Sequence, residues 1–286
     1  MPENRRRENP WPPRALGTGG AGKPTRFTYN ADALTGPGRP EQRQQPKDDA
    51  LPKRTVILHY HLFKNAGTSI DRILQTNFGD RWVTREFEGR GPQNTAAIVR
   101  WIKSEPEAVA FSSHTMVGPL PVMQDTRIIP VMMLRDPIAR LRSAYAFERT
   151  QGADTLGSIL ARHTDFEGYV RVRLAIAGDR QCRNFQTGRL ASLTAGSEPE
   201  RERALTSMDR IGVLGLVEHF DVALERLQSV IGGTFPAFKV ETVHANRSKP
   251  DPEPLDPALE ALLREANAVD YAIIDAFRKR NGLRAA

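Results

Sequence analysis

The sequence has very little cysteine and no long apolar run. Cys182 is the only cysteine among 286 residues, so no intrachain disulfide can form and folding does not depend on an oxidising compartment. No stretch resembles the apolar part of a signal peptide or a membrane-spanning helix. We therefore expect a cytoplasmic protein without an integral membrane segment.

The first fifty residues are poor in apolar side chains and rich in proline, glycine and arginine. Such a segment cannot bury enough apolar surface to offset backbone ordering, which costs about 1 to 2 kcal/mol per residue. We expect residues 1–50 to form a disordered basic tail. The remaining length suits one sizeable core, so we expect residues 51–286 to form one catalytic domain.

The formal net charge of +7 favours anionic partners, because a positive field raises their local concentration and association rate. The basic residues are dispersed along the chain, however. They lack the interleaved aromatic residues that are typical of proteins binding single-stranded nucleic acid. We therefore expect no nucleic-acid partner.

Short runs rich in Val, Ile and Leu alternate with amphipathic segments after residue 51, which predicts an α/β fold with a mainly parallel sheet. Strands buried on both faces are expected at 56–62, 108–113, 128–134 and 211–217, with a weaker fifth at 83–87. Helices are expected at 70–78, from Asp136-Pro137 onward, and at 155–174, 185–193, 200–208, 220–231 and 259–277.

The segment between the first strand and the first helix has the composition of a phosphate-binding loop. It reads His61-Leu62-Phe63-Lys64-Asn65-Ala66-Gly67-Thr68-Ser69. Backbone N–H groups at a helix N-terminus attract anions, and Gly67 permits a close approach of the backbone. Lys64 adds a full positive charge. Ligands of open parallel sheets bind at the carboxyl ends of the strands, where this loop is expected.

The order of residues in this loop differs from that of a Walker loop. In a Walker loop the lysine follows the glycines and directly precedes Ser or Thr, whereas Lys64 precedes Gly67. No carboxylate near a strand end can be assigned to magnesium, as a kinase or ATPase would need. A P-loop-like nucleotide-binding protein or kinase remains the alternative interpretation.

A second phosphate-binding element follows the strand at 128–134. Arg135 is expected at the carboxyl end of this strand, where a guanidinium can bind phosphate through two hydrogen bonds. Asp136 can cap the next helix with Pro137 at its first position. Ser143 follows two turns along that helix.

Together the two elements resemble PAPS-dependent sulfotransferases, most closely the branch that contains the heparan sulfate 2-O- and 6-O-sulfotransferases. The family's first loop typically reads His-hydrophobic-Pro-Lys-Thr-Ala-Gly-Thr-Ser, from which Phe63 and Asn65 depart. Its second motif, Arg-Asp-Pro followed by a serine and a tyrosine, matches Arg135 and Ser143. Further similarities are the run Arg183-Asn184-Phe185-Gln186-Thr187 and the late basic run Asn246-Arg247-Ser248-Lys249.

This resemblance implies a P-loop-like α/β fold and the donor PAPS, with 3′,5′-ADP as product and no metal. It implies that Arg135 and Ser143 bind the 3′-phosphate. The residues that it places at the 5′-phosphosulfate are Lys64, Asn65, Ala66, Gly67, Thr68 and Ser69. Lys64 would also stabilise the leaving phosphate during in-line transfer. The acceptor is a hydroxyl, which family analogy makes a carbohydrate hydroxyl; the sequence lacks the membrane anchor and disulfides of the animal Golgi enzymes.

The acceptor hydroxyl must lose a proton, and histidine is the side chain best suited to accept one near neutrality. His114 ends the expected strand 108–113 and corresponds approximately to the catalytic histidine of the 2-O-sulfotransferase branch. Other branches use a glutamate after the second strand. Glu86 or Glu88 is therefore the competing candidate for the base.

His59 and His61 alternate along one face of the first expected strand. Two histidines can begin a metal site, but the neighbouring sequence offers no Cys, Asp or Glu to complete the ligand set. We interpret the pair as residues that either pack in the core or orient the phosphate loop.

Overall fold

The apolar runs form a parallel β-sheet. The computed structural model describes residues 52–87, 93–240 and 254–284. Within them the sheet has the strand order β2-β3-β1-β4-β5, and every pairing is parallel. The strands are β1 (Arg54–Tyr60), β2 (Trp82–Thr84), β3 (Ala110–Ser113), β4 (Thr126–Leu134) and β5 (Val213–Leu216). This architecture confirms the α/β fold with a central parallel sheet.

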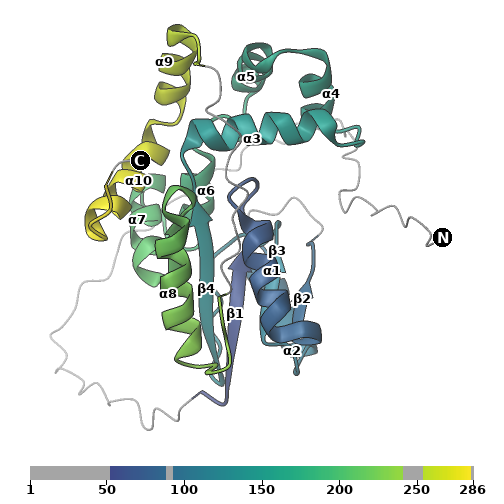
Figure 1. The fold of residues 1–286 in the computed structure, drawn as a ribbon, viewed down its shortest axis with the longest axis vertical. Coiled ribbons are helices and arrows are strands. Elements are labelled where there is room, and N and C mark those ends of the chain that lie inside the picture. Colours follow the sequence, from purple (N-terminus) through teal and green to yellow (C-terminus); the bar gives the residue numbers. More distant parts are fainter. Residues whose placement is uncertain (1–51, 88–92, 241–253, 285–286) are drawn as a thin grey trace, which may run out of the picture.

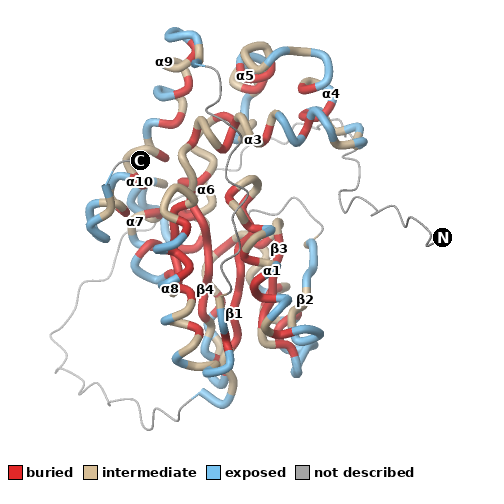
Figure 2. The backbone as a smooth tube through the Cα atoms, viewed as in Figure 1, coloured by how far each residue is buried: buried red, intermediate tan, exposed pale blue. Residues whose placement is uncertain are grey.

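Helices cover both faces of this sheet (Figures 1 and 2). Apolar side chains of α1 (Gly67–Phe78) and α8 (Phe220–Gly232) pack on one face. The other face packs against α2 (Thr95–Ser104), α6 (Phe185–Ser192), α7 (Glu200–Arg210) and α10 (Ala268–Arg280). Short 3-10 turns occupy Gly79–Arg81 and Val217–His219.

A further helical layer lies beyond the carboxyl ends of the strands (Figure 1). It consists of α3 (Pro137–Thr150), α4 (Leu156–His163), α5 (Phe166–Ala175) and α9 (Pro257–Ala266). These helices share a small apolar core that includes Leu141, Tyr169 and Leu263. This layer, which we call the cap, covers the edge of the sheet where ligands of such folds bind.

Strand register brings three loops together at that edge. Tyr60, the last residue of β1, pairs with Ser113 of β3 and with Met132 of β4. The phosphate loop after β1, His114 after β3 and Arg135 after β4 therefore all leave the sheet at the same edge. β1 lies in the middle of the sheet, which places the phosphate loop between the other two.

Most expected elements are present, with three differences. The segment 155–174 forms two helices, because Asp165 caps α5 by accepting a hydrogen bond from the Gly168 N–H (2.8 Å). The segment 259–277 is likewise divided at the buried Asn267, whose amide donates to the Cys182 carbonyl (2.9 Å). Helix α2 was not expected from the sequence. The tail 1–50, Glu88 and the run 246–249 lie outside the described residues.

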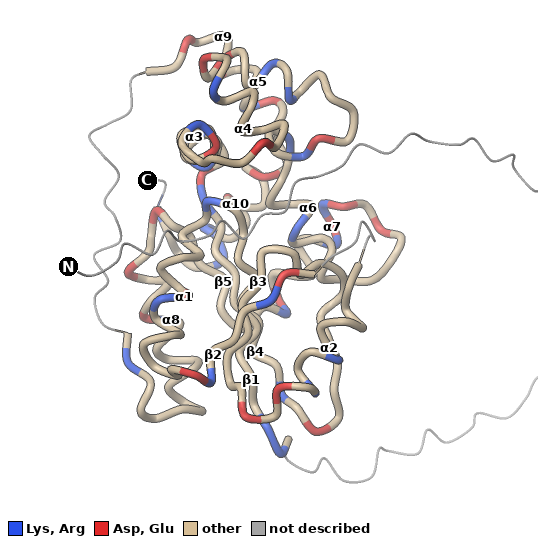
Figure 3. Tube along the Cα trace, turned by 90° about the vertical axis from the view of Figure 1, so that its right-hand side faces the viewer, with Lys and Arg blue, Asp and Glu red and all other residues tan. Residues whose placement is uncertain are grey.

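Figure 3 shows basic and acidic residues interspersed along the described chain. Across the described ranges, no helix has both the length and the apolar character needed to cross a membrane.

Candidate functional site

The loop between β1 and α1 has an unusual backbone. Lys64 has φ 64° and Ala66 has φ 56°, both in the left-handed region that side chains with a Cβ disfavour. In the described part of the chain no side chain caps α1, and its first turn contains no acidic residue. The N–H groups of Ser69 and Ile70 bond to the Ala66 carbonyl (3.0 and 3.3 Å), so an anion would bind the backbone N–H groups that precede them. Thr68 is exposed and Ser69 is half-buried beside them.

The His61 ring packs directly against Gly67 of this loop. A Cβ at Gly67 would lie 2.1 Å from the His61 ring, so the close approach requires glycine. The ring is held in place because its Nδ1 lies 2.7 Å from Oδ2 of Asp71 on α1. The His61 imidazole therefore connects the end of β1 to the first turns of α1.

Asn65 turns its side chain away from the loop and into the protein. It is fully buried, and its Nδ2 donates to the Met133 carbonyl (2.8 Å) and to Oε1 of Gln186 (2.7 Å). The side chain therefore anchors the loop to β4 and α6. Asn65 can therefore contact a ligand only through its backbone.

Gln186 joins the two expected phosphate elements. Its Oε1 also accepts the Arg135 backbone N–H (2.8 Å), and its Nε2 donates to the Arg135 carbonyl (2.7 Å). Arg135 in turn donates from Nη1 to the Lys64 carbonyl (3.1 Å). The loops after β1 and β4 are consequently one hydrogen-bonded unit.

Helix α6 is fixed by its own motif residues. Asn184, with φ 42°, accepts hydrogen bonds at Oδ1 from the backbone N–H groups of Val269 (3.1 Å) and Asp270 (3.2 Å). The Asp270 carboxylate accepts from the N–H groups of Gln186 (3.2 Å) and Thr187 (2.7 Å). A buried carboxylate at a helix N-terminus is favourable because of the helix dipole. The position of Gln186 is therefore set by α10.

Ser143 shares one side of α3 with Phe147, according to helical spacing. Phe147 stands one turn further on the same side, and its ring contacts the Phe63 ring (5.6 Å between centroids) and the Lys64 ammonium (4.7 Å). The start of α3 is as expected: Asp136 caps it by accepting the Ala139 N–H (2.8 Å), with Pro137 at the first position.

The cationic groups of the site are partly buried. Burial lowers the pKa of Lys64, and the nearby charge of Arg135 lowers it further. Burial also lowers the pKa of Arg135, although Glu218 and Asp136 oppose this. Two like charges held close together in this way favour a polyanionic ligand.

The two candidate bases lie in contact. Nδ1 of His114 is 2.8 Å from Oε1 of Glu86, which also accepts the His114 backbone N–H (3.1 Å). Burial opposes ionisation of Glu86, but the hydrogen bonds from His114 and Thr115 outweigh it and lower the pKa of the carboxyl. An ionised Glu86 favours the proton on Nδ1 of His114 and makes Nε2 the basic nitrogen.

The pair His59 and His61 does have a carboxylate neighbour, contrary to the sequence-based interpretation. Asp71 lies 2.7 Å from Nδ1 of each ring. The three residues could together hold a metal ion, but both distances are those of N–H···O hydrogen bonds. Sequence reasoning missed Asp71 because it lies on the helix that covers these histidines.

This histidine cluster extends to the candidate base. The rings of His61 and His114 lie 3.9 Å apart between centroids. Burial lowers the pKa of His61 to about 4, although its hydrogen bond to Asp71 opposes this. For Asp71, burial opposes ionisation, but the charge and hydrogen bond of His59 and the hydrogen bond of His61 lower its pKa. His61 is therefore a neutral neighbour of His114.

Helix α6 also supports the candidate base. Arg189, one turn after Gln186, donates from Nη2 to the His114 carbonyl (2.7 Å). Burial lowers the pKa of Arg189, and the charge of Glu86 opposes this. Phosphate loop, Arg135 and His114 are thus all held by one short helix.

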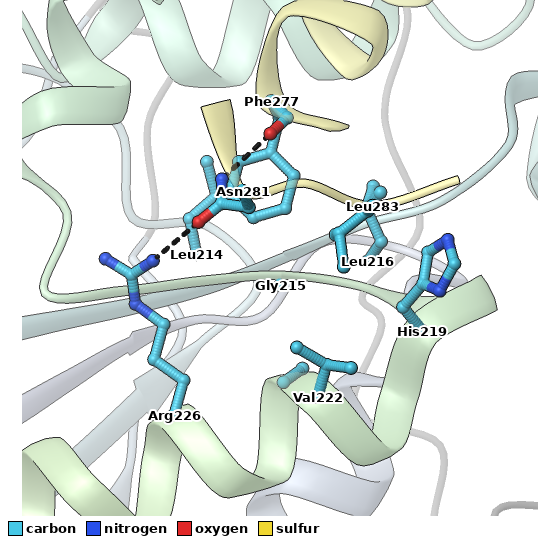
Figure 4. Close-up of a pocket in the computed structure, with 10 residues that line it drawn as sticks. Leu214, Gly215, Leu216, His219, Val222, Arg226, Phe277, Asn281 and Leu283 are labelled. Atoms are coloured by element: carbon cyan, nitrogen blue, oxygen red, sulfur yellow. Dashed lines mark hydrogen bonds between the residues drawn. The ribbon is translucent and has the colours of Figure 1, made fainter. Parts of the chain in front are cut away.

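A separate small hollow lies on the far side of β4, between β5, α8 and α10 (Figure 4). It is lined mainly by apolar side chains such as Leu214, Leu216 and Phe277. None of the expected site residues lines it. The candidate site is therefore the shared edge of β1, β3 and β4.

Comparison with known proteins identifies a relative. No model of a known protein family matches the chain. Over 228 residues the chain is 38% identical to an archaeal protein of Archaeoglobus fulgidus named "Uncharacterized protein". The match covers 76% of this chain and 89% of the archaeal protein. The chain belongs to the same family as this archaeal protein.

The buried neutral His61 predicts a loss of stability in acid. Its pKa of about 4 lies below the ordinary 6.5, so the unfolded chain binds more protons between these values. The free energy of unfolding should therefore fall by up to about 3 kcal/mol as pH drops from 6.5 to 4. Urea unfolding at a series of pH values measures this. His61→Gln should show a flatter profile, and parallel profiles would contradict the assignment.

The contact between Gly67 and His61 predicts that Gly67→Ala destabilises the protein by about 1 to 3 kcal/mol. The His61 ring cannot yield easily, because Asp71 and His114 hold it. Gly152→Ala is the matched control, since a Cβ there meets no atom within 4 Å. Its urea midpoint should stay close to that of the wild type. Equal midpoints for the two variants would show that His61 does not support the loop.

Proposed function

We propose that this protein is a PAPS-dependent sulfotransferase that transfers the sulfuryl group of PAPS in line onto a hydroxyl, with a carbohydrate as acceptor. The observation that carries the proposal is the hydrogen-bonded unit of the loops after β1 and β4. PAPS has phosphate groups at both its 5′ and 3′ positions. A donor of this kind needs two cationic phosphate sites at a fixed distance, and Gln186 ties two such elements together.

The N-terminus of α1 suits the 5′-phosphosulfate. Its uncapped backbone N–H groups and the Thr68 and Ser69 hydroxyls would hold the phosphate oxygens. Lys64 would lie near the oxygen that bridges phosphorus and sulfur. Arg135 and Ser143 would bind the 3′-phosphate from the strand end and from α3.

Transfer requires positioning and neutralisation of charge. The acceptor oxygen forms a bond to sulfur while the bond between sulfur and the bridging oxygen breaks. The electron pair of the broken bond stays on that oxygen, which belongs to the departing 3′,5′-ADP, and Lys64 stabilises its charge. The proton of the acceptor hydroxyl passes to Nε2 of His114. These steps place no demand on a metal ion.

Glu86 takes the role of a positioning carboxylate in this scheme. By accepting a hydrogen bond from the Nδ1–H of His114 it fixes the tautomer and the ring orientation (2.8 Å), and it stabilises the imidazolium that forms. This arrangement favours His114 over Glu86 as the base, because the Glu86 carboxylate is already occupied by His114 and Thr115. Location in the cytoplasm and the absence of a nucleic-acid partner stay predictions.

The donor assignment predicts tight binding of 3′,5′-ADP. In calorimetry, Lys64→Ala and Arg135→Ala should each weaken binding about 10- to 100-fold, because a hydrogen bond to a charged group contributes about 1.5 to 3 kcal/mol. Arg149→Ala removes a cation from the opposite side of α3 and is the matched control. Equal wild-type affinity for ATP would contradict the proposal and favour the nucleotide-binding alternative.

Comparison of 3′,5′-ADP with 5′-AMP separates the two phosphate sites. Arg135→Ala and Ser143→Ala should weaken the preference for 3′,5′-ADP, since only that ligand has a 3′-phosphate. Lys64→Ala should weaken the binding of both ligands by a similar factor. The reverse pattern would show that the two sites are assigned the wrong way round.

The contact between His114 and Glu86 predicts that the two act as a unit. His114→Ala should slow sulfuryl release from PAPS to water about 10²- to 10⁴-fold, the usual contribution of a general base. Glu86→Ala should add little to that loss in the double variant. Release is followed by chromatography of 3′,5′-ADP. If Glu86→Ala slows sulfuryl release by the same factor in the presence and in the absence of His114, Glu86 is an independent base.

A further inference from the structure

The ammonium group of Lys64 lies over an aromatic ring. Its Nζ is 4.7 Å from the centroid of Phe147 on α3. The preceding residue, Phe63, meets the same ring edge to face, at 5.6 Å and 73°. One side chain of the cap thus contacts two consecutive residues of the phosphate loop.

Lys64 needs such a partner. Within the described ranges no carboxylate lies at ion-pair distance from its ammonium. Burial and the charge of Arg135 both disfavour the cation. The negative face of an aromatic ring attracts a cation without supplying a carboxylate that would repel an anionic ligand.

The backbone at Lys64 also needs support. Its φ of 64° is strained for a residue with a Cβ, and such strain persists only where surrounding contacts enforce it. Arg135 holds the carbonyl of Lys64. The contacts with Phe147 hold the side chain and its neighbour Phe63, so both ends of the strained residue are fixed by the segment that runs from β4 into α3.

We propose that Phe147 is a positioning residue that holds the Lys64 ammonium beside the donor site. Phe147 is 37% exposed, so its ring does not serve chiefly as core. Ser143 lies one turn away on the same face of α3, so the ammonium is held on the face of α3 that carries the proposed 3′-phosphate residue. The inference rests on the proposed function for its catalytic meaning, but the seating of Lys64 on Phe147 can be tested without it.

The first test observes the ammonium directly. Lysines are dimethylated with ¹³C-formaldehyde, which keeps their charge, and the Lys64 signal is assigned with Lys64→Arg. Ring current should shift the Lys64 methyl signals upfield from those of the exposed Lys103 and Lys279. This measurement needs no variant of Phe147. Lys64 signals at the position of exposed lysines in the wild-type protein would overturn the proposal.

Variants of Phe147 then identify the ring that causes the upfield shift of the Lys64 signals. Phe147→Leu should move the Lys64 signals to the exposed position, whereas Phe147→Tyr should keep the upfield shift. Phe166→Leu removes a ring from the same cap, away from Lys64, and should also keep it. A persistent shift in Phe147→Leu would assign the effect to another ring and overturn the proposal.

A binding measurement tests the link to the donor. Phe147→Leu should weaken the binding of 3′,5′-ADP about two- to fivefold, the range expected of an exposed cation–π contact. Phe147→Tyr should bind 3′,5′-ADP with the wild-type affinity. Unchanged affinity in Phe147→Leu would remove the positioning role. Absence of 3′,5′-ADP binding in the wild type, together with an upfield Lys64 signal, would refute the proposed function and leave the seating of Lys64 intact.

Discussion

The candidate site depends on the side chain of Gln186. A single buried amide accepts from Asn65 and from the Arg135 backbone and donates to the Arg135 carbonyl. It therefore sets the distance between the two loops that leave the centre of the sheet. Because a buried polar group that loses a partner is costly, these loops cannot move apart independently. The same helix holds the His114 carbonyl through Arg189, so the two loops and His114 share one support.

Much of the fold follows from the pattern of the sequence. Runs of β-branched and aliphatic residues predict the parallel strands. Asp136 caps α3 as expected, and the structure shows a second Asp-Pro start at α9, where Asp256 is the cap. Helix boundaries inside long amphipathic stretches were not predictable in this way. Asn267 divides the last stretch because its side chain is needed by a distant carbonyl, at Cys182, and no local pattern records that need.

The candidate site could likewise be predicted from the sequence only in part. Lys64, Arg135 and His114 could be placed at one edge from the sequence, since each lies in the segment that follows an expected parallel strand. The roles of Asn65 and Gln186 could not be predicted, because these two hydrogen-bonded residues lie 121 residues apart in the chain. The motif Asn184-x-Gln186-Thr187 was visible in the sequence, but only the structure shows that each of its polar side chains binds α10 or the two loops. Asp71 and Phe147 were missed because they act from helices that pack over the loop.

The central claim is that this edge transfers a sulfuryl group. Its most direct test is incubation of the protein with PAPS radiolabelled in the sulfuryl group and with fractionated glycans, lipids and small alcohols. The account predicts that label appears in a carbohydrate fraction with the wild type and stays in the nucleotide with Lys64→Ala. Label that remains in the nucleotide with every fraction, while the wild-type protein binds 3′,5′-ADP, would contradict it.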